Sequence, residues 1–138
     1  MKRVLFLCTH NASRSQMAEA ILRRLAGGRF QAESAGTAPT EVHPLAVAAM
    51  REIGVDISGQ RSKSVDEFAE GSFDYVITLC DEAQEACPIF PAGVRRLHWG
   101  LPDPSAAKGD EAARLAVFRR IRDDLTDRIQ QFVSGAEL

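Results

Sequence analysis

The feature that most constrains this chain is a loop in which a cysteine and an arginine are separated by five residues, Cys8-Thr9-His10-Asn11-Ala12-Ser13-Arg14-Ser15. The loop follows a short apolar run, Arg3–Leu7, of the kind that forms a buried parallel strand. It leads directly into Ser15–Ala26, whose apolar residues recur with helical spacing before Gly27 and Gly28. A loop between a strand and a helix lies at the carboxyl end of the strand, where open α/β sheets bind their ligands.

The rest of the chain continues the alternation of strand and helix. We expect strands at Phe30–Ser34, Tyr75–Leu79 and Arg95–Trp99, and helices from about Pro44 to Gly54, over Asp81–Ala86 and from about Asp110. A capping box, Ser64-Val65-Asp66-Glu67, predicts a further short helix. The last helix carries an apolar stripe of Leu115, Phe118, Ile121, Leu125, Ile129 and Phe132. The pattern predicts one α/β domain over residues 1–138, with a mainly parallel sheet of about four strands and helices on both faces.

Length and charge exclude several classes of protein. The 138 residues are enough for one domain, and 17 basic against 19 acidic residues give a net charge of −2. This balance argues against electrostatic binding to nucleic acid or to an anionic membrane. The first apolar run has only four residues, Val4–Leu7, too few for a signal peptide or a membrane span. We therefore expect a cytoplasmic protein. We also expect it to be a monomer.

The chain has three cysteines, an odd number, and we expect no export signal. Both features argue against a structural disulfide framework. There is no CxxC pair, and His10, His43 and His98 are scattered rather than grouped at zinc-ligand spacing. The thiols are therefore either inert core residues or chemically active, and we expect no metal site.

The residue types of the loop suit the binding of a tetrahedral oxyanion. Backbone N–H groups of residues 9–15, wrapped around a helix N-terminus, would form a concave anion site, and Arg14 would add a planar fork of donors. The same charges stabilise a thiolate, so we expect Cys8 to be ionised near neutral pH. Ser15 could donate a hydrogen bond to its sulfur, and Asn11 tolerates the left-handed backbone that such a loop needs. The alternative is a buried Cys8 with Arg14 in a surface ion pair.

Several segments together resemble the low-molecular-weight tyrosine phosphatase fold and, within it, the thioredoxin-coupled arsenate reductases. They are Cys8–Asn11 with Arg14–Glu19, then Ser34-Ala35-Gly36, Thr78-Leu79-Cys80, Cys87-Pro88, and His98-Trp99-Gly100 leading to Asp103-Pro104. The resemblance implies that Cys8 attacks arsenate while Asp103 protonates the leaving oxygen. Oxidation would then pass from Cys8 to Cys80 and Cys87, and thioredoxin would reduce the final disulfide without a metal or organic cofactor.

Each of these assignments has a simpler alternative. Asp103-Pro104 could be an ordinary turn, Cys80 a core residue at a strand end, and Cys87 a residue that fills a helix end. The chain could also be a phosphatase that works through a Cys8 phosphoenzyme, although Ser105 stands where such phosphatases typically have tyrosine. A mycothiol- or glutaredoxin-coupled reductase would leave Cys80 or Cys87 dispensable. A non-enzymatic redox or arsenite sensor is disfavoured because the chain has no basic recognition helix.

Some members of the family bind potassium near the loop through an Asn, a Glu, a Ser and a downstream hydroxyl–x–carboxylate pair. Asn11, Glu19 and Ser34 match, but Arg61 and Lys63 stand in place of the downstream pair. Two cations cannot ligate K⁺, so we expect no specific potassium site and expect these side chains to pair with Glu19 instead.

Overall fold

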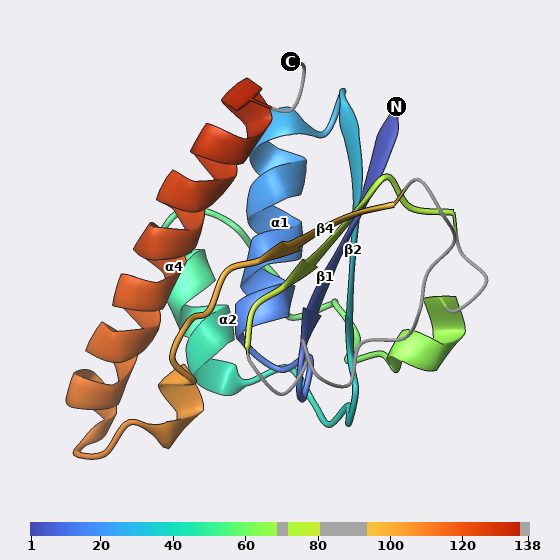
Figure 1. Ribbon diagram of the computed structural model, residues 1–138. Helices are drawn as coiled ribbons and strands as arrows, with labels where there is room; N and C mark the ends of the chain where they lie inside the picture. The colour runs from blue at the N-terminus through green and yellow to red at the C-terminus, as the bar shows by residue number, and fades with distance from the viewer. Residues whose placement is uncertain (69–71, 81–93, 136–138) are drawn as a thin grey trace.

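The elements follow one another as in Figure 1, a computed structural model that describes residues 1–68, 72–80 and 94–135. The strands are β1 (Lys2–Cys8), β2 (Phe30–Gly36), β3 (Tyr75–Thr78) and β4 (Arg95–His98). The α-helices are α1 (Arg14–Ala26), α2 (Pro44–Arg51) and α4 (Glu111–Gly135), and η1 (Val65–Phe68) and η2 (Pro104–Ala106) are short 3₁₀ helices. The helix expected over Asp81–Ala86 and the predicted relay residue Cys87 lie outside the described residues.

The four strands form one parallel sheet, as predicted from the sequence, and their order in the sheet is β2-β1-β3-β4. Strand β1 is central, and its residues Val4–Leu7 are fully buried, which is why it reads as a continuous apolar run rather than an alternating one. Leu7 is in register with Ala35 of β2 and Thr78 of β3. The carboxyl ends of β1 and β3 therefore meet at one edge of the sheet.

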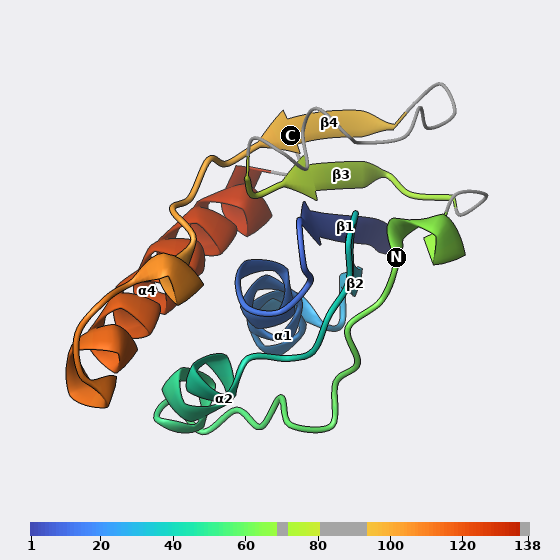
Figure 2. The same cartoon turned by 90° about the horizontal axis from the view of Figure 1, so that it is seen from below.

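Helices α1, α2 and α4 pack against one another and lie together to one side of the sheet, whereas η1 lies on the other side (Figure 2). The predicted stripe of α4 is the face that makes this contact: Phe118, Ile121, Leu125 and Ile129 are buried, and Leu115 and Phe132 pack at its margins. Burial of this stripe, more than helix propensity, fixes α4 against α1.

One predicted helix boundary and one predicted capping motif differ from the structure. Helix α2 ends at Arg51 rather than continuing to Gly54, and Gly54 takes a left-handed conformation with φ of 80° after the helix has ended. The capping box at Ser64 is only half formed, because Ser64 Oγ accepts from Asp66 N while the Glu67 carboxylate is bound by Arg61. A bidentate charge-assisted contact is stronger than a bond back to a neutral amide. The short helix predicted after Ser64 is present as η1.

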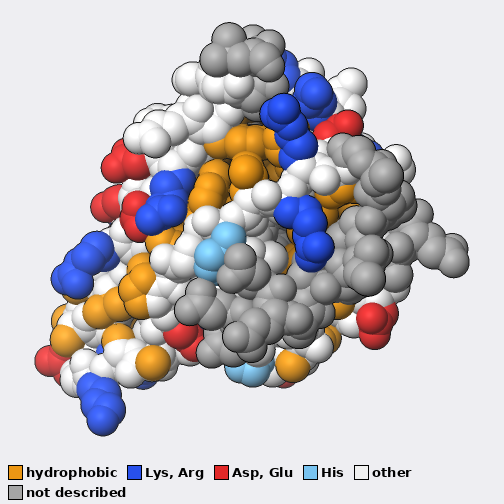
Figure 3. Space-filling model, in the orientation of Figure 1, with side chains coloured by type: hydrophobic (Ala, Val, Ile, Leu, Met, Phe, Trp, Pro, Cys, Tyr) orange, Lys and Arg blue, Asp and Glu red, His pale blue; other side chains and the backbone are white. Residues whose placement is uncertain are grey.

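The described helices include none that is long and apolar enough to cross a membrane. On the face seen in Figure 3, acidic and basic side chains are interspersed along α4, and apolar side chains show between α4 and the strands.

Candidate active site

The loop from Cys8 to Ser15 joins the end of β1 to the start of α1, as its sequence predicts. Three of its carbonyl groups point outward and accept hydrogen bonds from the following segment: Thr9 from Ala38 (2.8 Å), His10 from Thr40 (3.1 Å) and Ala12 from His43 (2.8 Å). In a trans peptide the C=O and the next N–H point in opposite directions. The amides that follow these carbonyls are therefore directed toward the inside of the loop, where an anion would lie.

Two residues provide the backbone geometry that this curvature needs. Asn11 is the one residue other than glycine with positive φ in the described chain, at 49°. Gly36 of β2 lies so close to the loop that a Cβ atom would meet Thr9 O at 2.6 Å and Asn11 N at 2.8 Å. A side chain at position 36 would push β2 away from the loop.

Cys8 is buried, and its Sγ lies 2.7 Å from the Oγ of Ser15. Asn11 Nδ2 donates a hydrogen bond of 2.7 Å to the same Oγ. Because the Ser15 oxygen already accepts from Asn11, its own hydrogen is available for the sulfur, an arrangement that stabilises a thiolate. The predicted contact between Ser15 and Cys8 is confirmed.

The Asn11 amide is itself held in one orientation. Its Oδ1 accepts from Gln16 Nε2 (2.9 Å) and from Lys63 N (2.8 Å). Gln16 is fully buried and receives a further bond of 2.6 Å from Gln60 Nε2. Sequence reasoning missed both glutamines, although a glutamine on the buried first turn of α1 is an unusual choice for a core position.

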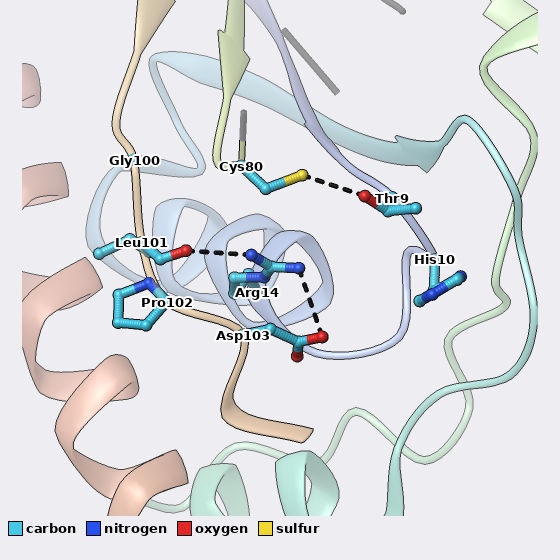
Figure 4. Close-up of a pocket in the computed structure, with 8 residues that line it drawn as sticks. All are labelled: Thr9, His10, Arg14, Cys80, Gly100, Leu101, Pro102 and Asp103. Atoms are coloured by element: carbon cyan, nitrogen blue, oxygen red, sulfur yellow. Dashed lines mark hydrogen bonds and ion pairs between the residues drawn. The ribbon is translucent and has the colours of Figure 1, made fainter. Parts of the chain in front are cut away.

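Arg14 is buried, so it does not form the surface ion pair of the simpler alternative. Its Nη1 donates to the carbonyl oxygen of Leu101 (3.0 Å), and its Nη2 lies 4.0 Å from Oδ2 of Asp103 (Figure 4). The guanidinium therefore connects the oxyanion loop to the segment that carries the predicted general acid.

Asp103 caps the 3₁₀ helix η2, and its Oδ1 accepts from Ser105 N (2.9 Å) and Ser105 Oγ (2.7 Å). Partial burial by itself would raise the pKa of Asp103. The two bonds from Ser105 and the positive charges of Arg14 and His10 outweigh burial and hold the pKa below its ordinary value. Asp103 is therefore a turn residue that also faces the site, and it is ionised in the free protein.

Cys80 is buried just beyond the end of β3, at the same sheet edge as Cys8, as predicted. The Leu79 amide bonds the Leu7 carbonyl (2.8 Å), which fixes the two strand ends side by side. The Cys80 Sγ points toward the loop and lies 3.2 Å from Thr9 Oγ1 (Figure 4). A cleft of about 600 Å³ opens here, lined by Thr9, His10, Arg14, Cys80, Gly100, Leu101, Pro102 and Asp103.

Beside the loop, the buried Glu19 carboxylate is surrounded by donors. Ser34 Oγ donates at 2.9 Å, Arg23 Nη1 at 2.8 Å, and Lys63 Nζ lies 3.6 Å away. The predicted pairing of Lys63 with Glu19 is confirmed, but that of Arg61 is wrong. Arg61 pairs with the exposed Glu67 instead, because its side chain leaves the segment on the solvent side.

Comparison with known proteins identifies the family. Residues 3–138 match the family model described as low molecular weight phosphotyrosine protein phosphatase. The chain belongs to this family. Within the phosphotyrosine phosphatase family, it is 43% identical over 136 residues to a protein of Bacillus licheniformis named arsenate reductase, covering 99% of this chain and 98% of the relative.

Solved structures of this family superpose on the chain. An arsenate reductase in an oxidized state matches with a TM-score of 0.84 and 35% identity, covering 97% of this chain and 98% of the other. A thioredoxin-dependent arsenate reductase of Corynebacterium glutamicum matches with a TM-score of 0.78 and 32% identity, covering 99% of this chain and 62% of the larger protein. The α/β fold predicted from the sequence is confirmed.

Proposed function

We propose that this protein reduces arsenate to arsenite, with Cys8 as nucleophile and a thiol relay through Cys80 and Cys87 that thioredoxin regenerates. The observation that carries the proposal is the second buried thiol at the oxyanion loop, Cys80, in contact with Thr9. A hydrolytic phosphatase needs one nucleophilic thiol, whereas a two-electron reduction by protein thiols needs at least two. The names of the relatives support the same reaction.

In the first step the Cys8 thiolate attacks arsenic in the loop, a sulfur–arsenic bond forms, and one arsenate oxygen leaves as water. Asp103 would supply a proton to that oxygen. Its carboxyl group is ionised in the free protein. A bound oxyanion would pair with Arg14, weaken the attraction between Arg14 and Asp103, and add a negative charge beside the carboxylate. Both effects favour the protonated carboxyl, so substrate binding would prepare the acid.

In the second step the Cys80 thiolate attacks the Cys8 sulfur. The sulfur–arsenic bond breaks, its electron pair remains on arsenic, and arsenite leaves while Cys8 and Cys80 form a disulfide. Arsenic gains two electrons and the two thiolates lose two. Thr9 Oγ1, which contacts Cys80 Sγ, would hold the second thiolate beside the loop.

In the third step Cys87 would attack Cys80, release the Cys8 thiolate and leave a Cys80–Cys87 disulfide. A dithiol reductant then restores all three thiols, and the thioredoxin-dependent relative from Corynebacterium glutamicum supports thioredoxin in that role. A reducing compartment, the cytoplasm, is where we expect such a cycle to operate. Phosphate and sulfate, as similar tetrahedral oxyanions, would compete with arsenate for the loop.

Single-turnover release of arsenite tests the proposal. The fully reduced protein, freed of added thiols and mixed with arsenate, should release one arsenite per chain. Cys80→Ser should release none, and Cys87→Ser should release one and accumulate the Cys8–Cys80 disulfide. Release of no arsenite by the unmodified protein, together with turnover of an aryl phosphate, would instead establish a phosphatase.

A second experiment separates thioredoxin from other reductants. The oxidised protein should regain its thiols with thioredoxin, thioredoxin reductase and NADPH. Restoration by a glutaredoxin or mycothiol system alone would assign the protein to one of those classes.

A further inference from the structure

Among the buried side-chain polar atoms of the described residues, one has no hydrogen-bond partner, and it is the Oγ of Ser13. Ser13 is only 4% exposed. It lies at the N-cap of α1, a position where serine normally accepts a hydrogen bond from an amide of the first helical turn. Here its backbone is at φ −131° and ψ −74°, and the side chain makes no capping bond.

A buried hydroxyl without a partner is costly, because it has lost its hydrogen bonds to water and gained none in the protein. Native proteins rarely keep such a group, so each one needs an explanation. Ser13 could have capped α1 and does not. The hydroxyl therefore has no acceptor among the described residues.

The surroundings of Ser13 indicate what acceptor would fit there. A small cavity beside the loop is lined by Cys8, His10, Ala12, Ser13, Arg14, Asp103 and Ser105. The first turn of α1 carries no acidic side chain that would offset the positive end of its dipole. The loop amides and the Arg14 guanidinium add to that positive field, which favours a negatively charged oxygen.

Two acceptors that border the same cavity already have donors. The Cys8 sulfur is bonded by Ser15, and Oδ1 of Asp103 receives two bonds from Ser105. An oxygen of a bound tetrahedral oxyanion would supply the missing acceptor.

We propose that the Ser13 hydroxyl donates a hydrogen bond to an oxygen of the arsenate or phosphate bound in the loop, in addition to the backbone amides and Arg14. The proposal rests on the proposed function insofar as it assumes that the loop binds an oxyanion. It assigns to Ser13 a side-chain contact with substrate, beyond its backbone amide.

Inorganic phosphate provides the test, because its binding needs no electron transfer. Phosphate should protect Cys8 against alkylation by iodoacetamide, and the concentration for half-protection reports its affinity. In Ser13→Ala this concentration should rise about 10-fold, the effect of losing one hydrogen bond to a charged group. The melting temperature of the phosphate-free variant should be equal to or higher than that of the unmodified protein, because the removed oxygen makes no bond there.

Ser15→Ala is the matched control, since Ser15 contacts the sulfur directly. This variant should shift the pH dependence of Cys8 alkylation, whereas Ser13→Ala should leave it unchanged. Three results would overturn the proposal: phosphate affinity within about twofold of the original, a lower melting temperature that accompanies the weaker binding, or a shifted alkylation profile in Ser13→Ala. If phosphate binding weakens as expected but the protein does not reduce arsenate, the reductase proposal fails and the assignment of Ser13 stands.

Discussion

The hydroxyl of Thr9 lies 3.2 Å from the sulfur of Cys80, although 71 residues separate them in the chain. Thr9 directly follows Cys8, so the oxyanion loop itself contacts the thiol that would attack the Cys8 sulfur. Parallel pairing of β1 with β3 brings the two positions to one sheet edge. The contact therefore places the Cys80 sulfur directly against the loop that begins at Cys8.

Thr9→Val tests this contact, because valine keeps the shape of threonine and removes the hydroxyl. We expect the rate of arsenite release in a single turnover to fall about 10-fold, as the Cys80 thiolate loses a hydrogen bond that holds it in position. Phosphate protection of Cys8 should change by less than about twofold. A variant that releases arsenite at the original rate would show that Thr9 does not position Cys80.

Asp103→Asn should slow formation of the Cys8–arsenate adduct by about 10²–10⁴-fold, the usual contribution of a general acid. Affinity for phosphate should not fall, because the proton is transferred only in the transition state and the variant removes a negative charge beside the bound oxyanion. Rapid-quench measurement of one turnover reports the rate. A full rate in Asp103→Asn would make the residue only the cap of η2.

Ser105→Ala should change the pH dependence of the same step, the formation of the Cys8–arsenate adduct. Removal of the Ser105 Oγ bond raises the pKa of Asp103, since that bond stabilises the charged form. A larger fraction of the carboxyl is then protonated at a given pH, so the descending limb of the pH–rate profile should move to higher pH. Ser105→Thr, which keeps the hydroxyl, should restore the original profile.

Lys63→Gln should lower the melting temperature by several degrees, because the buried Glu19 loses one of its two cationic partners. The control is Arg61→Gln, which breaks an exposed pair with Glu67 and should change the melting temperature far less. Replacing Na⁺ by K⁺ at constant ionic strength should leave the activity of the unmodified protein unchanged. Stimulation by K⁺ would contradict the prediction that Lys63 takes the place of a bound cation.

Glu52 links α2 to α4 through Arg119 (2.7 Å) and Arg122 (2.9 Å). The hydrogen bond from Arg119 is the largest cause that lowers the pKa of Glu52 to about 2. Because the folded pKa is depressed, the pair stabilises the fold above the pKa of the unfolded chain, about 4.3, and this contribution is lost as pH falls toward 2. The difference in melting temperature between the unmodified protein and Glu52→Gln should therefore be largest near neutral pH and should vanish in acid.

The sequence by itself determined the features that depend on neighbouring residues. The apolar run of β1, the loop that follows it and the helical spacing of α1 are local, and so is the left-handed position of Asn11. The apolar stripe of α4 can also be predicted from the sequence, because residues three and four apart share a helix face. These local patterns were enough to predict the fold class, the loop between β1 and α1, and the sheet edge at which Cys80 lies.

Tertiary structure decided which side chains meet. Lys63 and Arg61 carry the same charge and are two residues apart, yet one side chain reaches the buried Glu19 and the other turns to solvent. The ionised state of Asp103 depends on Arg14, 89 positions earlier in the printed sequence, and on whether Ser105 turns its hydroxyl back. The unpartnered hydroxyl of Ser13 likewise depends on how the loop is closed by the strands and segments around it. Such contacts are set by strand register and packing across the whole chain, because hydrogen bonds and ion pairs require atoms within about 3–4 Å, a precision that local sequence patterns do not encode.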